Sequence, residues 1–129
     1  MSKATLQSVA PVFLVRNITD SIQYWVEKVG FDAKTFEENP RFAIVSRDTV
    51  RIMLVEIGLG AKIVPNWTVV ESTNDAYIWV DDARDMYHEI LERGAYIDYT
   101  IYDTPWGTRE FGIQDPDNHD ITFGQILEK

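Results

Sequence analysis

The sequence predicts an α+β fold in which two βαβββ repeats form a curved mixed sheet with a central cleft. The first observation is an internal repeat. Phe42-Ala43-Ile44-Val45 matches Phe111-Gly112-Ile113-Gln114 at an offset of 111 − 42 = 69, and Ile52 matches Ile121 at the same offset. The second observation is that each half of the chain contains one segment with helical periodicity and several segments in which apolar and polar residues alternate as in strands. The third is length, since 129 residues suit one domain or two half-domains that share a core. We therefore expect a single domain over 1–129, with half-repeats at about 7–57 and 74–126 and a linker at 58–73.

The first half is expected to form a strand, a helix and three further strands. Val9–Val15 is apolar throughout, as in a strand buried on both faces, and Pro11 favours a sheet edge or a strand end. A helix follows, which Asn17 or Thr19 caps and Gly30 ends. Its apolar residues at helical spacing are Ile22, Trp25, Val26 and Val29. The remaining strands are Phe31–Glu38, Arg41–Ser46 and Val50–Glu56.

The second half repeats this order. Asp82 suits the N-cap of a helix and Gly94 its end, and Val80 ends its strand as Val15 ends the first, at an offset of 80 − 15 = 65. The expected elements are a strand at Ala76–Asp81, a helix at Asp82–Arg93, a strand at Tyr96–Tyr102, and a hairpin of Arg109–Gln114 and His119–Gly124. The helical residues expected to point inward are Met86, Ile90 and Leu91.

Alternation along the strands separates a core face from a second, mixed face. The residues predicted under the helices are Ile52, Leu54, Ala76, Ile78, Val80, Ile121 and Phe123. The opposite face receives Ala10, Val12, Leu14, Arg51, Met53, Val55, Asp75, Tyr77, Trp79, Asp120 and Thr122. Aromatic side chains beside charged ones suit a concave, partly wet ligand cavity. A dimer interface, or a face covered by the 57–73 segment, accounts for the same pattern, and the sequence leaves these alternatives open.

Composition and charge narrow the function classes. The chain contains no cysteine, which excludes disulfides, thiolate nucleophiles and thiolate metal sites. Its net charge of −9 repels nucleic acid; it attracts cationic small molecules or serves only solubility. No apolar run approaches the about 18 residues of a membrane span, and the first residues lack the apolar segment of a signal peptide. We therefore expect a cytoplasmic protein that binds neither nucleic acid nor membrane.

The last hairpin carries a family resemblance. Phe111, followed by Asp115-Pro116-Asp117-Asn118-His119-Asp120-Ile121, resembles the F-x-D-P-x-G-N-x-I signature of the vicinal oxygen chelate superfamily, with the usual glycine missing and Asn118 one place early. That superfamily includes glyoxalase I, extradiol dioxygenases, and bleomycin- and fosfomycin-resistance proteins. Pro105-Trp106-Gly107 with Arg109-Glu110-Phe111 is similar to the bleomycin-resistance branch. So are Val9-Ala10-Pro11-Val12, Arg47-Asp48-Thr49-Val50, Val64-Pro65-Asn66 and Ala76-Tyr77-Ile78-Trp79-Val80. The resemblance covers nearly the whole chain and implies the glyoxalase/bleomycin-resistance fold.

The resemblance also implies where a metal would bind. The superfamily's enzymes hold a divalent metal with four residues, one from each of four strands, usually His, Glu or Gln. The corresponding positions here are Ala10, Met53, Asp75 and Thr122, and the repeat agrees, since 75 − 10 = 65 and 122 − 53 = 69. Ala10 and Met53 cannot bind a hard or borderline cation, Thr122 is a poor ligand, and Asp75 alone is insufficient. We therefore expect no metal and no other cofactor.

The two histidines do not change this expectation. His88 and His119 belong to no recognisable metal or catalytic-triad spacing. His88 lies on the predicted second helix, where a solvent-exposed role is expected, and His119 opens the last strand, where a structural hydrogen bond is expected.

Eight residues are candidates for ligand binding. The resemblance implies that three aromatic residues line the cleft: Phe42, Tyr77 and Trp106. Strand alternation and a loop position add Arg51, Asp75, Trp79, Asp120 and Trp67. Flat aromatics hold planar cationic ligands by stacking and cation–π contacts, each worth about 0.5–2 kcal/mol. The two aspartates pair either with a cationic ligand or with Arg51, and the sequence does not decide between these.

The resulting hypothesis is a non-catalytic small-molecule binding protein that sequesters a planar, cationic antibiotic of the bleomycin type. The resemblance further implies a homodimer with clefts at the subunit interface, and it allows exchange of N-terminal segments between subunits. The alternative is a metal-dependent lyase or dioxygenase of the same superfamily with an atypical metal site. A third hypothesis is an accessory module of unrelated metabolism that has kept only the fold.

Overall fold

Each half of the chain folds as βαβββ in the computed structural model, which describes residues 2–128. The elements of the first half are β1 (Val12–Val15), α1 (Ile18–Val29), β2 (Asp32–Lys34), β3 (Phe42–Arg47) and β4 (Val50–Glu56). The elements of the second half are β5 (Ala76–Trp79), α2 (Ala83–Arg93), β6 (Tyr96–Asp103), β7 (Thr108–Gln114) and β8 (Asp120–Ile126). A short 3₁₀ helix, Asn66–Thr68, lies in the linker. The predicted repeat is confirmed.

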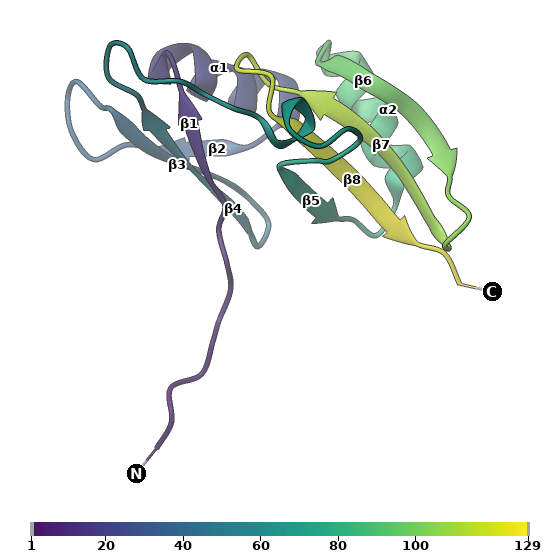
Figure 1. Cartoon of the computed structure of the whole chain (residues 1–129). Coiled ribbons are helices and arrows are strands. Elements are labelled where there is room, and N and C mark those ends of the chain that lie inside the picture. Colours follow the sequence, from purple (N-terminus) through teal and green to yellow (C-terminus); the bar gives the residue numbers. More distant parts are fainter. Residues whose placement is uncertain (1, 129) are drawn as a thin grey trace.

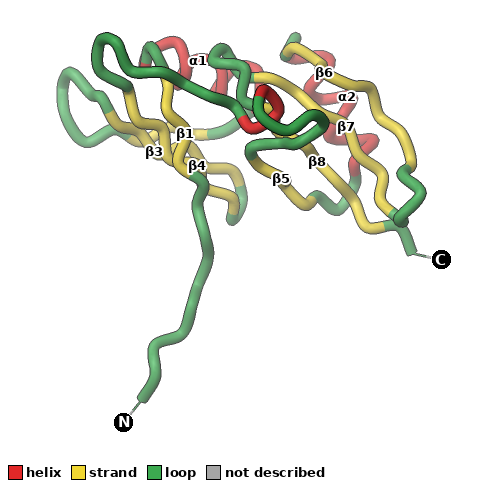
Figure 2. Tube along the Cα trace, in the orientation of Figure 1, coloured by secondary structure: helices red, strands yellow, loops and turns green. Residues whose placement is uncertain are grey.

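The strands form two four-stranded sheets with the same order of equivalent strands. One sheet has the order β1-β4-β3-β2 and the other β5-β8-β7-β6, and in each the first pair is parallel and the rest antiparallel. Figure 1 shows the two halves side by side, with α1 and α2 on the same side of the sheets. The tube view in Figure 2 shows the linker crossing from the first half to the second. The sequence therefore predicted the mixed sheet correctly, and hydrogen bonding divides it into two.

One hydrophobic core joins the halves. Trp25 of α1 and Ile90 of α2 are fully buried in the same cluster as strand residues from both sheets. The strand residues of that cluster include Phe13, Val15, Ala43, Val45, Ile52, Leu54, Ile78, Phe111, Ile113, Ile121 and Phe123. The alternation argument thus assigned the core face correctly. No helix among residues 2–128 is long and apolar enough to cross a membrane.

Both helices have the predicted ends. The Asn17 side chain accepts a hydrogen bond from the Asp20 amide, and the Asp82 side chain accepts one from the Asp85 amide. Each helix ends at a glycine with a left-handed backbone, Gly30 at φ 77° and Gly94 at φ 80°. His88 is exposed on α2, as expected.

The prediction that Leu91 points inward is wrong, and Val26 of the apolar pattern in the first helix also lies outward. Val26 is 39% exposed and Leu91 is 46% exposed. Each directly follows a fully buried helical residue, Trp25 or Ile90, and a step of about 100° carries the next side chain out of a narrow buried stripe. Both helices therefore bury a narrower face than their apolar residues suggested.

The first two predicted strands are shorter in the structure. The run Val9–Val15 forms a strand only from Val12, because Pro11 has no amide to donate to the sheet. This strand is not buried on both faces, since Val12 is 56% and Leu14 is 44% exposed. Phe31–Glu38 contracts to the three residues of β2 at the edge of the sheet. Figure 1 shows the segment before β1 running away from the rest of the chain.

The repeat offset of 69 holds for β4 and β8 but not for β3 and β7. Met53 pairs with Ile44, whereas Thr122, its equivalent at 122 − 53 = 69, pairs with Gly112. The offset between β3 and β7 is therefore 112 − 44 = 68, and the second hairpin turn is one residue longer. A shift of one residue changes the face of every side chain. Phe42 is consequently equivalent to Glu110 and not to the buried Phe111.

Candidate functional site

A hollow with polar and aromatic walls lies on the second sheet, on the face opposite α2. This cavity, called here the C-terminal cleft, has a volume of about 900 Å³. Its aromatic walls are Trp67, Tyr96, Tyr99, Tyr102 and Trp106. Its carboxyl groups belong to Asp98, Glu110 and Asp120. The remaining lining residues are Ser72, Thr73, Asn74, Thr100, Gln114 and Thr122. The volume and this mixture are typical of sites for drug-sized molecules.

Two glycines shape the sheet beneath the cleft. A Cβ atom at Gly112 would overlap the ring of Tyr99, and one at Gly124 would overlap the hydroxyl end of Tyr77. Both tyrosines therefore lie across the sheet where other residues would project side chains. The absence of two side chains is what lets aromatic rings form the floor of this region.

Hydrogen bonds fix the two tyrosines. The Tyr99 and Thr122 hydroxyl oxygens are 2.7 Å apart, and the Tyr77 hydroxyl donates to Glu110 Oε2 at 2.6 Å. Burial, together with the hydrogen bond to Glu110, raises the pKa of Tyr77 to about 12, and burial likewise raises the pKa of Tyr99. Both hydroxyl groups therefore remain protonated at neutral pH and keep these hydrogen bonds.

Asp120 is the most unusual ionisable group of the cleft. Its residue is only 5% exposed. Burial, and then the neighbouring carboxyl group of Asp98, raise its pKa to about 8. Among residues 2–128, no arginine, lysine or histidine forms an ion pair with Asp98, Glu110 or Asp120. The cleft therefore contains carboxyl groups without a protein cation to neutralise them.

The linker forms one wall of the cleft and is tied to the sheet by hydrogen bonds. The carboxylate of Asp75 accepts the amide of Asn66 at 2.9 Å through one oxygen and the amide of Asp120 at 2.8 Å through the other. The indole N–H of Trp67 donates to the carbonyl oxygen of Asn118 at 2.7 Å. Asp75 thus has a structural role in holding the wall, and Trp67 is fixed at its edge.

The turn that begins β8 buries Asp115, Asp117 and His119 and is held by hydrogen bonds within the turn. Asp115 Oδ1 accepts the amides of Asp117 and His119, and Asp115 Oδ2 lies 2.8 Å from His119 Nδ1. Burial lowers the pKa of His119, but the hydrogen bond and charge of Asp115 outweigh it, so the net pKa is raised. The imidazole stacks on Phe13 of β1 with ring centroids 4.4 Å apart. The predicted structural hydrogen bond of His119 is present, and it helps to dock the second half onto the first.

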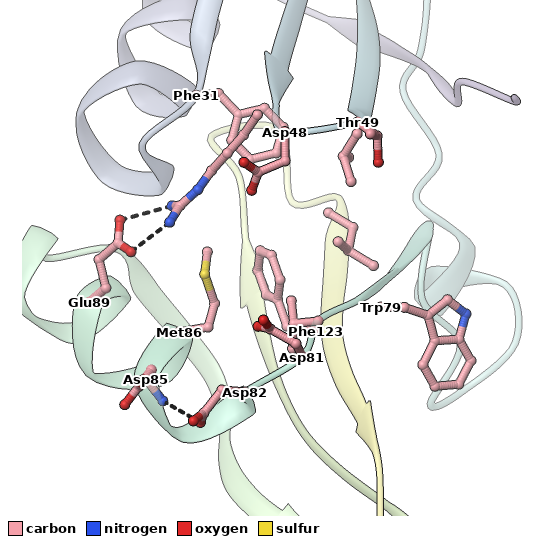
Figure 3. A pocket seen from close by; sticks show the side chains of 14 residues that line it. Phe31, Asp48, Thr49, Trp79, Asp81, Asp82, Asp85, Met86, Glu89 and Phe123 are labelled. Carbon is pink, nitrogen blue, oxygen red and sulfur yellow. Dashed lines mark hydrogen bonds and ion pairs between the residues drawn. The ribbon is translucent and has the colours of Figure 1, made fainter.

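A second cavity of about 490 Å³ lies between the β3–β4 turn and α2. Figure 3 shows its carboxylates on several elements and its apolar side chains, Met86 and Phe123, inside. One bridge crosses it: Arg47 donates to both carboxylate oxygens of Glu89, at 2.7 and 2.8 Å. Trp79 lies at one side with its indole turned away from Met86. Because a salt bridge already joins its two walls, we interpret this cavity as a gap at the interface between the two halves of the chain.

The structure brings together only some of the eight candidate residues. Those lining the C-terminal cleft are Trp67, Trp106 and Asp120. Tyr77 lies beside the cleft and contacts it through Glu110. Asp75 holds the linker, and Trp79 lines the second cavity, although its ring lies 4.6 Å from that of Tyr77.

The other two candidates lie on the first half. Phe42 stacks on Phe36 with ring centroids 5.9 Å apart, and Arg51 is exposed on β4. Neither lines the C-terminal cleft or the second cavity, and Arg51 forms no ion pair with Asp75 or Asp120 within residues 2–128.

The cleft residues that sequence reasoning missed include Glu110 and five residues of β6. Glu110 was hidden by the incorrect offset for β7, which placed Phe111 opposite Phe42. The β6 residues were missed because the open face of that strand was not assigned: Tyr96, Asp98, Tyr99, Thr100 and Tyr102. Period-two alternation would have placed Asp98 and Tyr102 together. Tyr99 joins them because the pairing of β6 with β7 shifts between Ile97 and Tyr99 and again before Tyr102.

The positions of the family's metal ligands do not fit a metal in this chain. Ala10 has no donor atom, and Met53 offers only a thioether. Both carboxylate oxygens of Asp75 already accept backbone amides, and the Thr122 hydroxyl is bound to Tyr99. Among residues 2–128 no group of three or more His, Cys, Asp or Glu side chains is arranged to hold a metal ion. These four positions therefore do not offer a divalent metal the donor set that the superfamily's enzymes use.

Comparisons with known proteins match this architecture. The sequence model of the Glyoxalase/Bleomycin resistance protein/Dioxygenase superfamily matches residues 6–123. Bleomycin resistance proteins of Geobacillus stearothermophilus and Staphylococcus aureus are 31% identical over 133 residues, covering 95% of this chain and 98% of theirs.

Solved structures show the same fold at lower identity. The bleomycin-binding protein of Streptomyces verticillus, complexed with copper(II)-bleomycin, has a TM-score of 0.69 and 20% identity, with 98% of this chain and 100% of that chain covered. TnmS3, an antibiotic binding protein from Streptomyces sp. CB03234, has a TM-score of 0.67 and 24% identity, with 95% and 99% covered. A glyoxalase-related enzyme from Clostridium phytofermentans has a TM-score of 0.75 and 14% identity, with 96% and 98% covered.

Proposed function

Because the chain belongs to the glyoxalase/bleomycin resistance protein/dioxygenase superfamily, we propose that it binds a planar, cationic antibiotic of the bleomycin type and sequesters it unchanged. The observation that carries this proposal is the C-terminal cleft, where aromatic rings surround carboxyl groups that have no cationic partner among the described residues. The net charge of −9 favours the approach of a cationic molecule. The curated relatives named above, bleomycin resistance proteins, support the same ligand class.

Three side chains are assigned to the ligand. Trp106, which is 70% exposed at the cleft, offers a free aromatic face for stacking on a planar group. Trp67 also lines the cleft and is held by its bond to Asn118. Asp120 provides a buried carboxyl group for a cation. Roles for Phe42, Arg51 and Trp79 stay predictions, since these residues lie outside the cleft of a single chain.

Sequestration without catalysis is supported by the chemistry of the residues present. The superfamily's enzymes use a metal held by four strand residues, and two of those positions here are Ala10 and Met53. The remaining two are engaged in hydrogen bonds that build the cleft wall. A lyase or dioxygenase reaction would need a metal site from other residues, and no cluster within 2–128 offers one.

A homodimer in the cytoplasm completes the proposal. The open face of the first sheet carries exposed apolar side chains, including Val12 at 56% and Leu14 at 44%, which a partner subunit would cover. Phe42 shares that face, so a partner would place this ring near a cleft formed by two subunits. This arrangement would give the sequence-predicted Phe42 its role in binding.

The experiment is a fluorescence titration of the purified, metal-stripped protein with metal-free bleomycin. We expect saturable tryptophan quenching with a dissociation constant of about micromolar or below, and at least a tenfold loss of affinity in Trp106→Ala. Leu59→Ala serves as the control, because Leu59 is fully exposed in the linker, away from the cleft. Absence of binding by the folded protein contradicts the proposed ligand. Tight stoichiometric metal and activity lost on chelation would favour the enzymatic alternative.

A further inference from the structure

The acidic groups of the C-terminal cleft are concentrated at one place. Asp98, which is exposed on β6, and Asp120 on β8 line the same cavity, with Glu110 on the intervening strand β7, and the carboxyl group of Asp98 contributes to the raised pKa of Asp120. Asp75 contributes further negative charge, although its oxygens are taken up by backbone amides. Gln114 is the neutral neighbour of Asp120. Within residues 2–128 no basic side chain faces this pair closely enough for an ion pair.

The side chain of Asp120 is buried although the fold uses only the backbone of this residue. Its backbone is fully used by the sheet and by Asp75, so the fold does not require its side chain to be acidic. The residue is only 5% exposed, yet it lines an open cavity, so this exposed part faces the cleft. A buried carboxyl group beside another one is costly to ionise, so the pair holds a proton at neutral pH unless a cation takes the place of that proton. Selection for binding explains this arrangement better than selection for stability.

The surroundings of the pair restrict the shape of that cation. The rings of Tyr99 and Tyr102 lie on the same strand as Asp98, with centroids 6.0 Å apart and planes at 70° to each other. These rings and the indole of Trp106 suit a flat aromatic group beside the carboxyl groups. Two adjacent carboxyl groups offer several acceptor oxygens and no donor when ionised. Their best partner is therefore a cation that donates two or more N–H bonds.

Building on the proposed function, we propose that Asp98 and Asp120 form a dicarboxyl subsite that selects ligands whose planar group carries an N–H-bearing cation, such as an amidinium, guanidinium or primary ammonium. A quaternary ammonium or sulfonium group has the same charge but cannot donate hydrogen bonds, so the subsite discriminates against it. The subsite thus sets specificity among cations, whereas the aromatic walls set affinity for planar groups.

The test uses three probes of matched shape: 2-naphthamidine, the trimethyl(2-naphthyl)ammonium ion and neutral 2-naphthamide. Calorimetric titration of the full chain at pH 7 should show the amidine binding at least tenfold more tightly than either of the other probes. In Asp98→Asn and in Asp120→Asn this preference should fall below threefold. Asp32→Asn, an exposed aspartate on β2, is the matched control and should keep the preference. Circular dichroism verifies that each variant is folded.

Two results would overturn the subsite. One is equal affinity of the wild-type protein for the amidine and the quaternary ion, or no measurable amidine binding at millimolar concentration. The other is a tenfold preference that survives in both Asn variants. Titration of the same samples with bleomycin separates this proposal from the proposed function. Amidine preference without bleomycin binding would leave the subsite standing and reject the drug, and bleomycin binding without amidine preference would do the reverse.

Discussion

The two halves of this protein have the same topology but opposite surfaces on their open sheet faces, which are the faces away from the helices. At six equivalent positions the first half carries Val12, Leu14, Phe42, Ile44, Met53 and Val55. The second half carries Tyr77, Trp79, Glu110, Gly112, Thr122 and Gly124. One face is apolar and uncovered, and the other is polar, hollow and partly closed by the linker. A duplicated unit has thus provided one surface suited to a protein partner and one suited to a small molecule.

Burial of polar groups shows the same division. Among residues 2–128, the buried polar or charged residues number nine, of which eight lie in the second half and only Ser21 in the first. They are concentrated at the cleft and at the turn between β7 and β8. Buried polar groups are costly unless they are bonded, so a concentration of them indicates a region shaped by binding as well as by stability.

The largest predicted effect is a difference between the two hairpin turns in their contribution to the free energy of unfolding. Asp115 accepts two backbone amides and pairs with His119 in a buried turn, whereas Asp48 is exposed in the equivalent turn of the first half. We expect Asp115→Asn to lower the free energy of unfolding by about 2–3 kcal/mol, because hydrogen bonds to a buried charge are lost. Asp48→Asn should change it by less than about 0.5 kcal/mol. Urea unfolding measures both, and similar values for the two would show that the turns are energetically alike.

The next effect concerns the glycines under the cleft. Gly124→Ala would push its Cβ into the Tyr77 hydroxyl and break the contact with Glu110. The expected destabilisation is about 2 kcal/mol, as for other overpacked sites, accompanied by weaker ligand binding. Gly58→Ala is the control, since a Cβ there meets no neighbouring atom. Thermal unfolding of both variants decides the matter, and an unchanged midpoint for Gly124→Ala would mean that Tyr77 moves freely.

The smallest effect concerns the bridge between the halves. Arg47→Met removes the pair with Glu89 and the bond to the Val29 carbonyl, and should cost about 1 kcal/mol at pH 7. The hydrogen bond from Arg47, opposed by burial and aided by Arg93, lowers the pKa of Glu89. A lowered carboxyl pKa stabilises the fold above the usual value of 4.5, and this contribution is lost as the pH falls through the folded-state pKa.

The unfolding free energies of wild type and Arg47→Met should therefore differ at pH 7 and converge near pH 3. The matched control is Arg41→Met, since Arg41 pairs with Glu56 at 3.6 Å and is largely exposed. A difference between wild type and Arg47→Met that persists unchanged at pH 3 would show that lost packing, and not the charge pair, is responsible.

Periodicity predicted the fold because core positions depend on local alternation. Ile52, Leu54, Ile121 and Phe123 are all buried as their strands required. The errors arose where one residue shifts the pattern. A hairpin turn one residue longer moved β7 relative to β3, and the irregular pairing of β6 brought Tyr99 to the cleft beside Asp98.

The site was less predictable because its members depend on contacts between distant segments. Asp75 was predicted to bind the ligand, but its carboxylate accepts the amides of Asn66 in the linker and Asp120 in β8, and contacts between such distant segments cannot be predicted from local sequence. Alternation placed Trp79 on the same face as the cleft residues. It lies, however, at the end of a short edge strand, beside the second cavity. Loop aromatics were better guides, since Trp67 and Trp106 both line the cleft.

The most direct measurement is an NMR titration with metal-free bleomycin that follows the indole N–H signals of the four tryptophans. Trp67 and Trp106 report on the C-terminal cleft, Trp79 on the second cavity and Trp25 on the core. Binding in the cleft predicts saturable shifts of the Trp67 and Trp106 signals that exceed those of Trp79, with Trp25 unchanged. The largest shift at Trp79, with Trp67 and Trp106 unmoved, would contradict the assignment of ligand binding to the open face of the second half.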